Sequence, residues 1–121
     1  MEARSIMSTI KVDTIQNTSG VEVYTAKAWV NFNGTGTVAI RAGGNVSSIT
    51  DNGTGDYAVN FTSSISDNSY SSYGSAGSQD ATLWDRIMSP YQSSSAFCRI
   101  RVTASNATIS DVSYASFEVT R

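Results

Sequence analysis

The sequence of 121 residues contains no histidine, one cysteine and one proline. Without histidine, neither a Ser-His-Asp nor a Cys-His catalytic arrangement can form, and histidine-based metal sites are excluded. Cys98 has no second cysteine with which to pair inside the chain. Because it alternates in phase with Ile100 and Val102, we expect a buried core residue rather than a nucleophile, with an interchain disulfide as the alternative.

Charge is also scarce. Charged residues make up 15% of the chain, against ~25% in an average protein, and the net charge is −2. Binding to nucleic acid needs clustered Lys and Arg, and the nearest approach is the pair Arg99 and Arg101. Their spacing places both on one face of a strand, which favours a solvated face or a subunit salt bridge. We therefore expect no nucleic-acid partner.

Long apolar runs are missing as well. No window approaches the ~20 apolar residues of a membrane span, so membrane insertion is not expected. Residues 1–7 lack the apolar stretch of a secretory signal. The sequence therefore predicts synthesis in a cytoplasm and release by assembly or lysis. Ser, Thr, Asn and Gly take the place of charge, a composition that suits an extracellular or virion protein.

The dominant period of hydrophobicity is two, which is typical of half-buried antiparallel strands. Five runs show strand character, at residues 28–32, 38–41, 56–62, 96–103 and 114–120. Turn signals rich in Asn and Gly separate them, at residues 33–36, 43–45 and 51–55. The pattern predicts an all-β fold, an antiparallel, jelly-roll-like β-sandwich over residues 26–121.

Two middle segments are less regular. Residues 63–79 carry few aliphatic side chains, which predicts a long loop or a weakly specified strand. Residues 80–88 could form a strand or one helical turn ahead of Pro90.

Residues 1–25 predict an extended N-terminal arm. Short strands at 9–16 and 21–24 flank a turn at 17–20, and two strands alone make poor independent structure. They become stable when they pair with neighbouring chains, which also closes open sheet edges. We therefore expect a homo-oligomer, a homotrimer by preference, in which the arm buries five apolar side chains. These are Ile10, Val12, Ile15, Val21 and Val23.

Two parts of the chain resemble phage proteins. Residues 8–16 resemble the opening of tail-fibre and virion proteins of marine and cyanobacterial phages, and residues 28–36 with 49–62 resemble their β-rich fibre-tip module. The resemblance implies a trimeric virion structural protein, made in the host cytoplasm, that projects from the particle and touches the host surface. A head fibre, a capsid decoration or a tail-tip protein, bound to other virion proteins through the arm, is the structural alternative. A third class, a secreted carbohydrate-binding module of a bacterium, predicts a monomer.

Aromatic side chains suggest where a ligand would bind. Sugars stack on aromatic faces that hydroxyl and amide groups flank, and tyrosine gives a large contact area at low entropic cost. Segment 66–92 is predicted to recognise a host glycan or protein through Tyr70, Tyr73, Trp84 and Tyr91. In the competing interpretation, Trp84 and Tyr91 belong to the core and Tyr70 and Tyr73 to a subunit interface. Trp29 is expected in the core or an interface.

Paired carboxylates are the remaining route to catalysis, as in glycosidases. Most of the candidates lie in polar, turn-like segments, where Asp is common anyway. They are Asp51, Asp56, Asp67, Asp80 and Asp85. Residues 51–56 lack the spacing and distal Glu of an EF-hand calcium loop, so a turn is expected there. The sequence predicts no enzymatic activity, no cofactor and no metal.

Overall fold

The computed structural model describes residues 9–21, 25–78 and 85–121, and these parts contain eight strands. The strands are β1 (Ala26–Asn33), β2 (Ala39–Gly44), β3 (Val46–Gly53), β4 (Asp56–Phe61), β5 (Ser71–Gly77), β6 (Arg86–Ser93), β7 (Phe97–Ala104) and β8 (Tyr114–Thr120). The described ranges hold no helix that is long and apolar enough to cross a bilayer.

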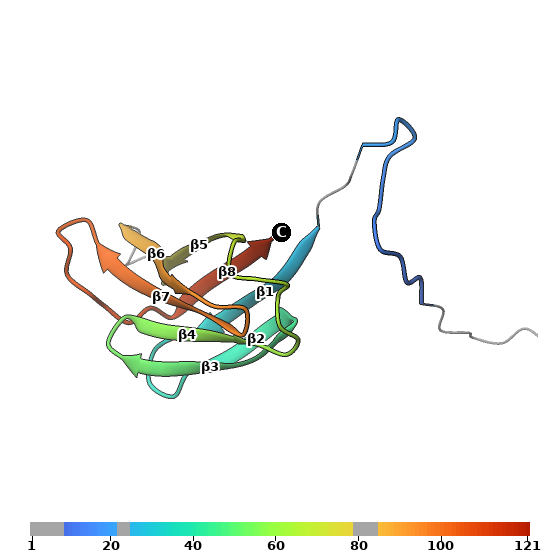
Figure 1. Ribbon diagram of the computed structural model, residues 1–121. Coiled ribbons are helices and arrows are strands. Elements are labelled where there is room, and N and C mark those ends of the chain that lie inside the picture. The colour runs from blue at the N-terminus through green and yellow to red at the C-terminus, as the bar shows by residue number, and fades with distance from the viewer. Residues whose placement is uncertain (1–8, 22–24, 79–84) are drawn as a thin grey trace, which may run out of the picture.

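The strands form two antiparallel four-stranded sheets that pack face to face (Figure 1). The first sheet has the order β2-β1-β8-β5 and the second sheet the order β3-β4-β7-β6. Three hairpins, β1–β2, β3–β4 and β6–β7, stay within one sheet, whereas the other connections pass from one sheet to the other. The predicted antiparallel sandwich is confirmed.

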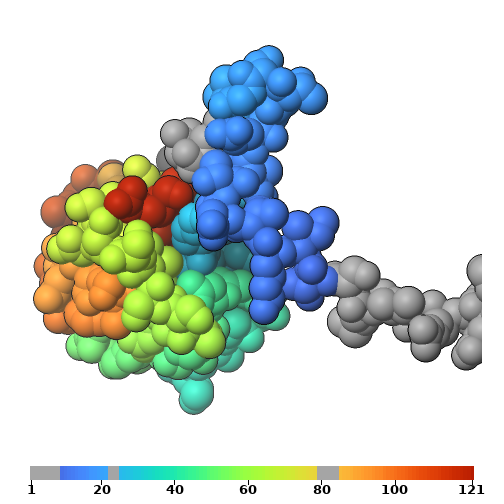
Figure 2. Space-filling model, turned by 45° about the vertical axis from the view of Figure 1, so that its right-hand side comes forward, coloured from blue at the N-terminus to red at the C-terminus, as the bar shows by residue number. Residues whose placement is uncertain are grey.

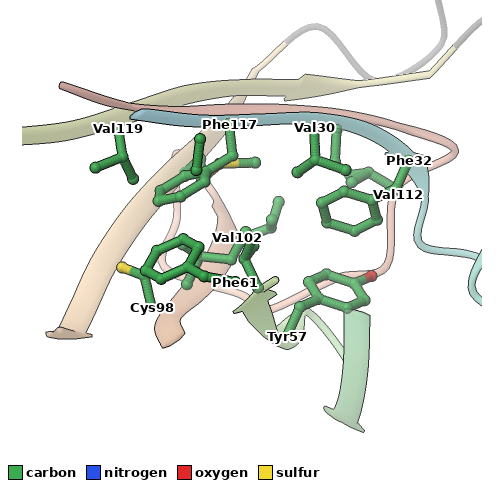
Figure 3. Close-up of a cluster of buried hydrophobic side chains, with 14 of the residues drawn as sticks. Val30, Phe32, Tyr57, Phe61, Cys98, Val102, Val112, Phe117 and Val119 are labelled. Atoms are coloured by element: carbon green, nitrogen blue, oxygen red, sulfur yellow. The ribbon is translucent and has the colours of Figure 1, made fainter. Parts of the chain in front are cut away.

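The core lies between the sheets and follows from the alternation of side chains along the strands. In β1, β4, β7 and β8 the inward positions are apolar and buried, as the burial patterns show. Side chains from both sheets meet in one cluster (Figure 3), in which the Phe32 and Tyr57 rings pack edge to face with centroids 5.2 Å apart. Cys98, Ile100 and Val102 are fully buried, so the prediction of a core cysteine is confirmed. Burial also raises the pKa of the Cys98 thiol.

The two irregular segments contain strands at the sheet edges. β5 lies within residues 63–79 and is the last strand of the first sheet. β6 carries Pro90 at the edge of the second sheet, where a missing backbone N–H is tolerated. For residues 80–88, the sequence predicts a strand or one helical turn. Residues 86–88 form the start of the strand β6, and residues 79–84 lie outside the described residues.

The N-terminal segment, residues 9–21, stands away from the sandwich (Figures 1 and 2). The predicted turn is present, since Gly20 N donates to Asn17 O over 3.0 Å and Asn17 Oδ1 accepts from the Ser19 and Val21 amides. The predicted strand at 9–16 is not among the eight strands. Apart from a single bridge at Gln16, the described residues 9–16 form no ladder of hydrogen bonds that would hold a strand. Of the second predicted strand, 21–24, residues 22–24 lie outside the described residues.

Candidate functional site

The outer face of the first sheet carries the most exposed aromatic side chains that the strands themselves present. Along β1, Ala28, Val30 and Phe32 point into the core, so Trp29 must point outward. It is 44% exposed, and Tyr73 of β5 is 54% exposed. Of the two expectations for Trp29, placement in the core is therefore wrong, and placement in an interface stays a prediction. The run Ala28-Trp29-Val30 is apolar on both faces, so only its phase with Phe32 identifies the outward residue.

Strand register aligns these two rings across the sheet. Glu118 of β8 pairs with Trp29 on one side and with Tyr73 on the other. A hydrogen bond to Glu118 raises the pKa of the Tyr73 hydroxyl, with smaller contributions from burial and from the Glu118 charge. Three adjacent strands thus present a continuous row of indole, carboxylate and phenol.

Gly44 of β2 continues the row and holds the indole in place. It pairs with Trp29, and a Cβ at this position would lie only 2.5 Å from Trp29 Nε1 and 3.0 Å from Cδ1. The indole therefore lies directly over the glycine backbone, an arrangement in which an aromatic side chain covers a glycine of the neighbouring strand. This contact orients the ring before any ligand binds.

A second row runs beside the first. Ser116 of β8 pairs with Asn31 of β1 and with Ser75 of β5, which places an amide and two hydroxyl groups next to the aromatic rings. A shallow hollow of about 180 Å³ lies between Tyr73 and Glu118, with Ser75 and Ser116 in its lining. We call this surface the aromatic face. Its members are Trp29, Asn31, Tyr73, Ser75, Ser116 and Glu118.

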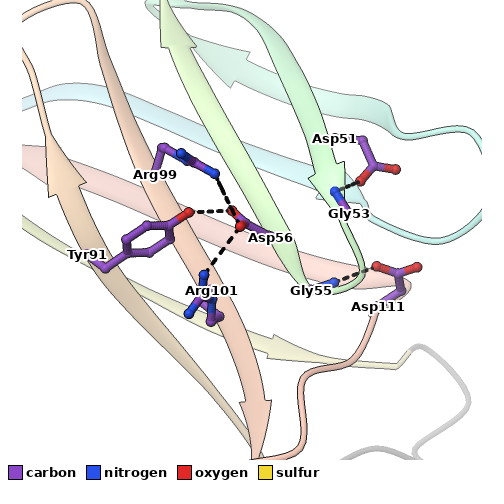
Figure 4. A network of polar contacts seen from close by, with 8 residues as sticks. All are labelled: Asp51, Gly53, Gly55, Asp56, Tyr91, Arg99, Arg101 and Asp111. Carbon is purple, nitrogen blue, oxygen red and sulfur yellow. Dashed lines mark hydrogen bonds and ion pairs between the residues drawn. The ribbon is translucent and has the colours of Figure 1, made fainter.

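The outer face of the second sheet carries a different group, the Asp56 cluster, which consists of Asp56, Tyr91, Arg99 and Arg101 (Figure 4). Asp56 accepts a 2.6 Å hydrogen bond from the Tyr91 hydroxyl, and its Oδ2 lies 3.2 Å from Arg99 Nη2 and 3.4 Å from Arg101 Nη2. Both guanidinium groups also lie over the Tyr91 ring, at 5.2 and 4.7 Å from its centroid.

The Asp56 cluster is largely satisfied internally. Burial alone would raise the pKa of Asp56, but the hydrogen bond from Tyr91 and the charge of Arg99 and Arg101 outweigh it and lower the pKa below 3.8. The predicted common face for Arg99 and Arg101 is confirmed, since both contact Asp56. The cluster therefore joins β4, β6 and β7, and its polar groups are mostly used in contacts with one another.

We expect Asp56→Asn to cost about 1 kcal/mol of stability at neutral pH, because a largely covered carboxylate loses its ion pairs with two partly exposed arginines. A lowered folded-state pKa means that the contribution is present above the unfolded value of 3.8 and is lost as the pH falls through the folded value. Urea unfolding at neutral pH and at about pH 2.5 checks this: the variant and the wild type should converge in acid. Asp13→Asn, in the exposed N-terminal segment, is the control. An acid-independent difference would contradict the assignment.

The four residues predicted to bind a ligand do not form one surface. Tyr73 belongs to the aromatic face and Tyr91 to the Asp56 cluster, on the outer sides of different sheets. Tyr91 is 43% exposed, so its alternative placement in the core is wrong. Trp84 lies outside the described residues.

Tyr70 packs against the sandwich instead. Its hydroxyl lies 3.0 Å from Ser94 O and 3.1 Å from Phe97 O, and its ring meets Phe61 edge to face with centroids 5.9 Å apart. The packing interpretation therefore suits Tyr70 better than the binding one, although the contacts are within the chain. Tyr70 and Tyr91 do share the lining of a hollow of about 290 Å³ between β5 and β6.

The predicted oligomerisation residues are available for contact. Ile10, Val12, Ile15 and Val21 are between 50% and 86% exposed, and Val23 lies outside the described residues. Within residues 9–21, 25–78 and 85–121, no three acidic, cysteine or histidine side chains gather in a group that could hold a metal ion. Comparison of the chain with protein families, with curated proteins and with solved structures finds no match.

Proposed function

We propose that the chain is a non-catalytic phage virion protein of the fibre type, which projects from the particle and binds surface polysaccharide of the host. The row of Trp29, Glu118 and Tyr73 across three strands carries this proposal. An exposed tryptophan and tyrosine on a rigid sheet supply stacking area without an ordering cost. The resemblance of residues 8–16, 28–36 and 49–62 to phage fibre proteins supports the virion role.

The N-terminal segment supports assembly with other chains. Four apolar side chains in residues 9–21 are at least half exposed, and none of them belongs to the hydrophobic core that the structure describes. Removing such a set of side chains from water favours association. A homotrimer joined through this arm, and attached by it to other virion proteins, is the assembly we propose. A purely structural decoration or tail-tip protein would use the same arm but would leave the aromatic face unoccupied.

The full-length chain should adsorb to immobilised lipopolysaccharide and exopolysaccharide of cyanobacteria and other marine bacteria. Trp29→Ala should abolish the adsorption, because it removes the largest ring of the aromatic face. Surface plasmon resonance measures the adsorption, and sedimentation velocity of the same sample measures its mass. Tyr91→Ala, which removes an exposed tyrosine from the opposite sheet, is the matched control.

Each outcome decides between the candidate functions. A multimer that adsorbs is the expected result. A multimer that binds no polysaccharide would favour the structural virion role, and a compact monomer that binds would favour a secreted carbohydrate-binding module. Either of these results would overturn the proposal.

A further inference from the structure

The aromatic face also indicates what kind of polysaccharide it fits, an inference that rests on the proposed function. We infer that the face binds an extended, neutral glycan that lies across β1, β8 and β5. Trp29 and Tyr73 stack under two sugar units that are not neighbours, and Glu118 accepts hydrogen bonds from the unit between them. The direction of the glycan is perpendicular to the strands, along the row of paired residues.

The spacing of the two rings sets the geometry of the ligand. Two ladder steps separate the Cα atoms of Trp29 and Tyr73 by about 10 Å, and the indole lies over Gly44, on the side of Trp29 away from Glu118. The two rings are therefore separated by at least the length of two units of an extended, β-1,4-linked pyranose chain. A helical α-1,4-linked glucan curves away from a flat surface over this length.

The group between the rings selects the chemistry of the ligand. Glu118 offers only acceptor oxygens when ionised, so it requires hydroxyl donors and repels sulfate or carboxylate groups on a sugar. Tyr73 pairs with Glu118 in the strand register, and Glu118 raises the pKa of the Tyr73 hydroxyl, so the carboxylate lies beside one of the stacking rings. The neighbouring row adds the Asn31 amide and the hydroxyls of Ser75 and Ser116 for the sugar rim. The hollow between Tyr73 and Glu118 has room for a single sugar ring.

The composition of the face argues for a glycan rather than for a second copy of the chain. The core of a homodimer interface is enriched in apolar area and depleted in charged residues. Here a carboxylate lies at the centre, and Asn and Ser side chains fill the adjacent row. A protein partner would bury Glu118 together with Arg41, a cation on the same outer face that already contacts Asn31 Oδ1 and the Tyr114 ring. Sugar hydroxyls can hydrogen-bond to both groups and leave them partly hydrated.

Isothermal titration of the full-length chain tests the inference with defined hexasaccharides. We expect binding of cellohexaose and β-1,4-mannohexaose, and no binding of maltohexaose or of hexamannuronate, a β-1,4-linked chain of uronic acids. Trp29→Ala and Tyr73→Ala should each weaken binding about tenfold or more, the scale of one lost aromatic contact. Glu118→Gln keeps the size of the side chain, removes its charge and should admit hexamannuronate. Tyr91→Ala, on the other sheet, should bind as the wild type does, and a circular dichroism spectrum confirms that each variant is folded.

The failure of this inference is separable from that of the proposed function. If bacterial polysaccharide is retained but maltohexaose or hexamannuronate is preferred, the inference on glycan shape and charge is overturned and the proposed function stands. If neither polysaccharide nor any hexasaccharide binds, both fall. If Trp29→Ala lowers the mass of the protein in sedimentation instead of its affinity, the occupant of the aromatic face is a second copy, and the inference is wrong.

Discussion

Gly74→Ala should lower the free energy of unfolding by about 2–3 kcal/mol, because a Cβ at this position has no space and would clash with its neighbours. Gly74 lies in β5 opposite Phe117, where the edges of the two sheets meet. Its Cβ would lie 2.3 Å from Met88 Sδ of β6 and 2.3 Å from Ser116 O of β8. The methionine can move, but the backbone oxygen belongs to the paired strand, so β5 must shift away from β8.

Thermal unfolding followed by circular dichroism measures the effect, and a fall in melting temperature of about 8–12 °C is expected for a domain of this size. Ser75→Ala, the next residue on the strand, points outward and should change stability by less than about 0.5 kcal/mol. In the double variant Gly74→Ala with Met88→Ala, the methionine contact is relieved but the contact with Ser116 O remains. Full recovery in the double variant would mean that β5 and β8 are not as close as the structure has them.

The inner half of the fold could be predicted from the sequence because burial depends on local alternation. In the runs 56–62 and 114–120, a period of two puts the apolar side chains of each run on one face. The structure buries all six, which are Tyr57, Val59, Phe61, Ala115, Phe117 and Val119. A period of two is imposed by the backbone of each strand and does not depend on which strands are neighbours. The strand β5 could not be predicted in this way, because its Ser and Gly residues show no alternation of apolar and polar side chains.

The outer faces could not be predicted in the same way, because they depend on strand order. Glu118 is 89 positions from Trp29 and 45 positions from Tyr73 in the chain, and only the order β1-β8-β5 makes the three neighbours. The predicted recognition segment 66–92 instead combined aromatic residues that are close in the chain. The structure places two of them, Tyr73 and Tyr91, on different sheets. Only the outward phase of Trp29 relative to Val30 and Phe32 could have indicated this face.

The two outer faces have different physical roles as a result. In the Asp56 cluster, each charge faces an opposite charge or an aromatic ring, so the groups stabilise one another. On the aromatic face, the row contains one carboxylate and two half-exposed rings, and its hydrogen-bonding capacity exceeds what Tyr73 uses. Unused acceptors and exposed rings are what a ligand can bind, which is why we place recognition on the first sheet.

Tyr57→Phe should cost about 2 kcal/mol of stability, because it removes a buried hydroxyl that joins three segments. The hydroxyl lies 2.8 Å from Gly34 O and 2.9 Å from Asp111 Oδ1, so it links β4 to the β1–β2 turn and to the segment that precedes β8. Asp111 Oδ1 also accepts from the Gly55 amide over 2.8 Å. Burial raises the pKa of Tyr57, and the hydrogen bond to Asp111 raises it further, so the donor form is kept at neutral pH.

Urea unfolding of Tyr57→Phe, Asp111→Ala and the double variant separates this contact from its surroundings. The sum of the stability losses of the two single variants should exceed the loss of the double variant by about 1 kcal/mol, because both single variants remove the same interaction. Tyr114→Phe, which removes a hydroxyl from a tyrosine that is 40% exposed, should be nearly neutral. Strict additivity of Tyr57→Phe and Asp111→Ala would show that the hydroxyl donates to Gly34 O alone, and the closure of this end of the sandwich would then rest on the β1–β2 turn.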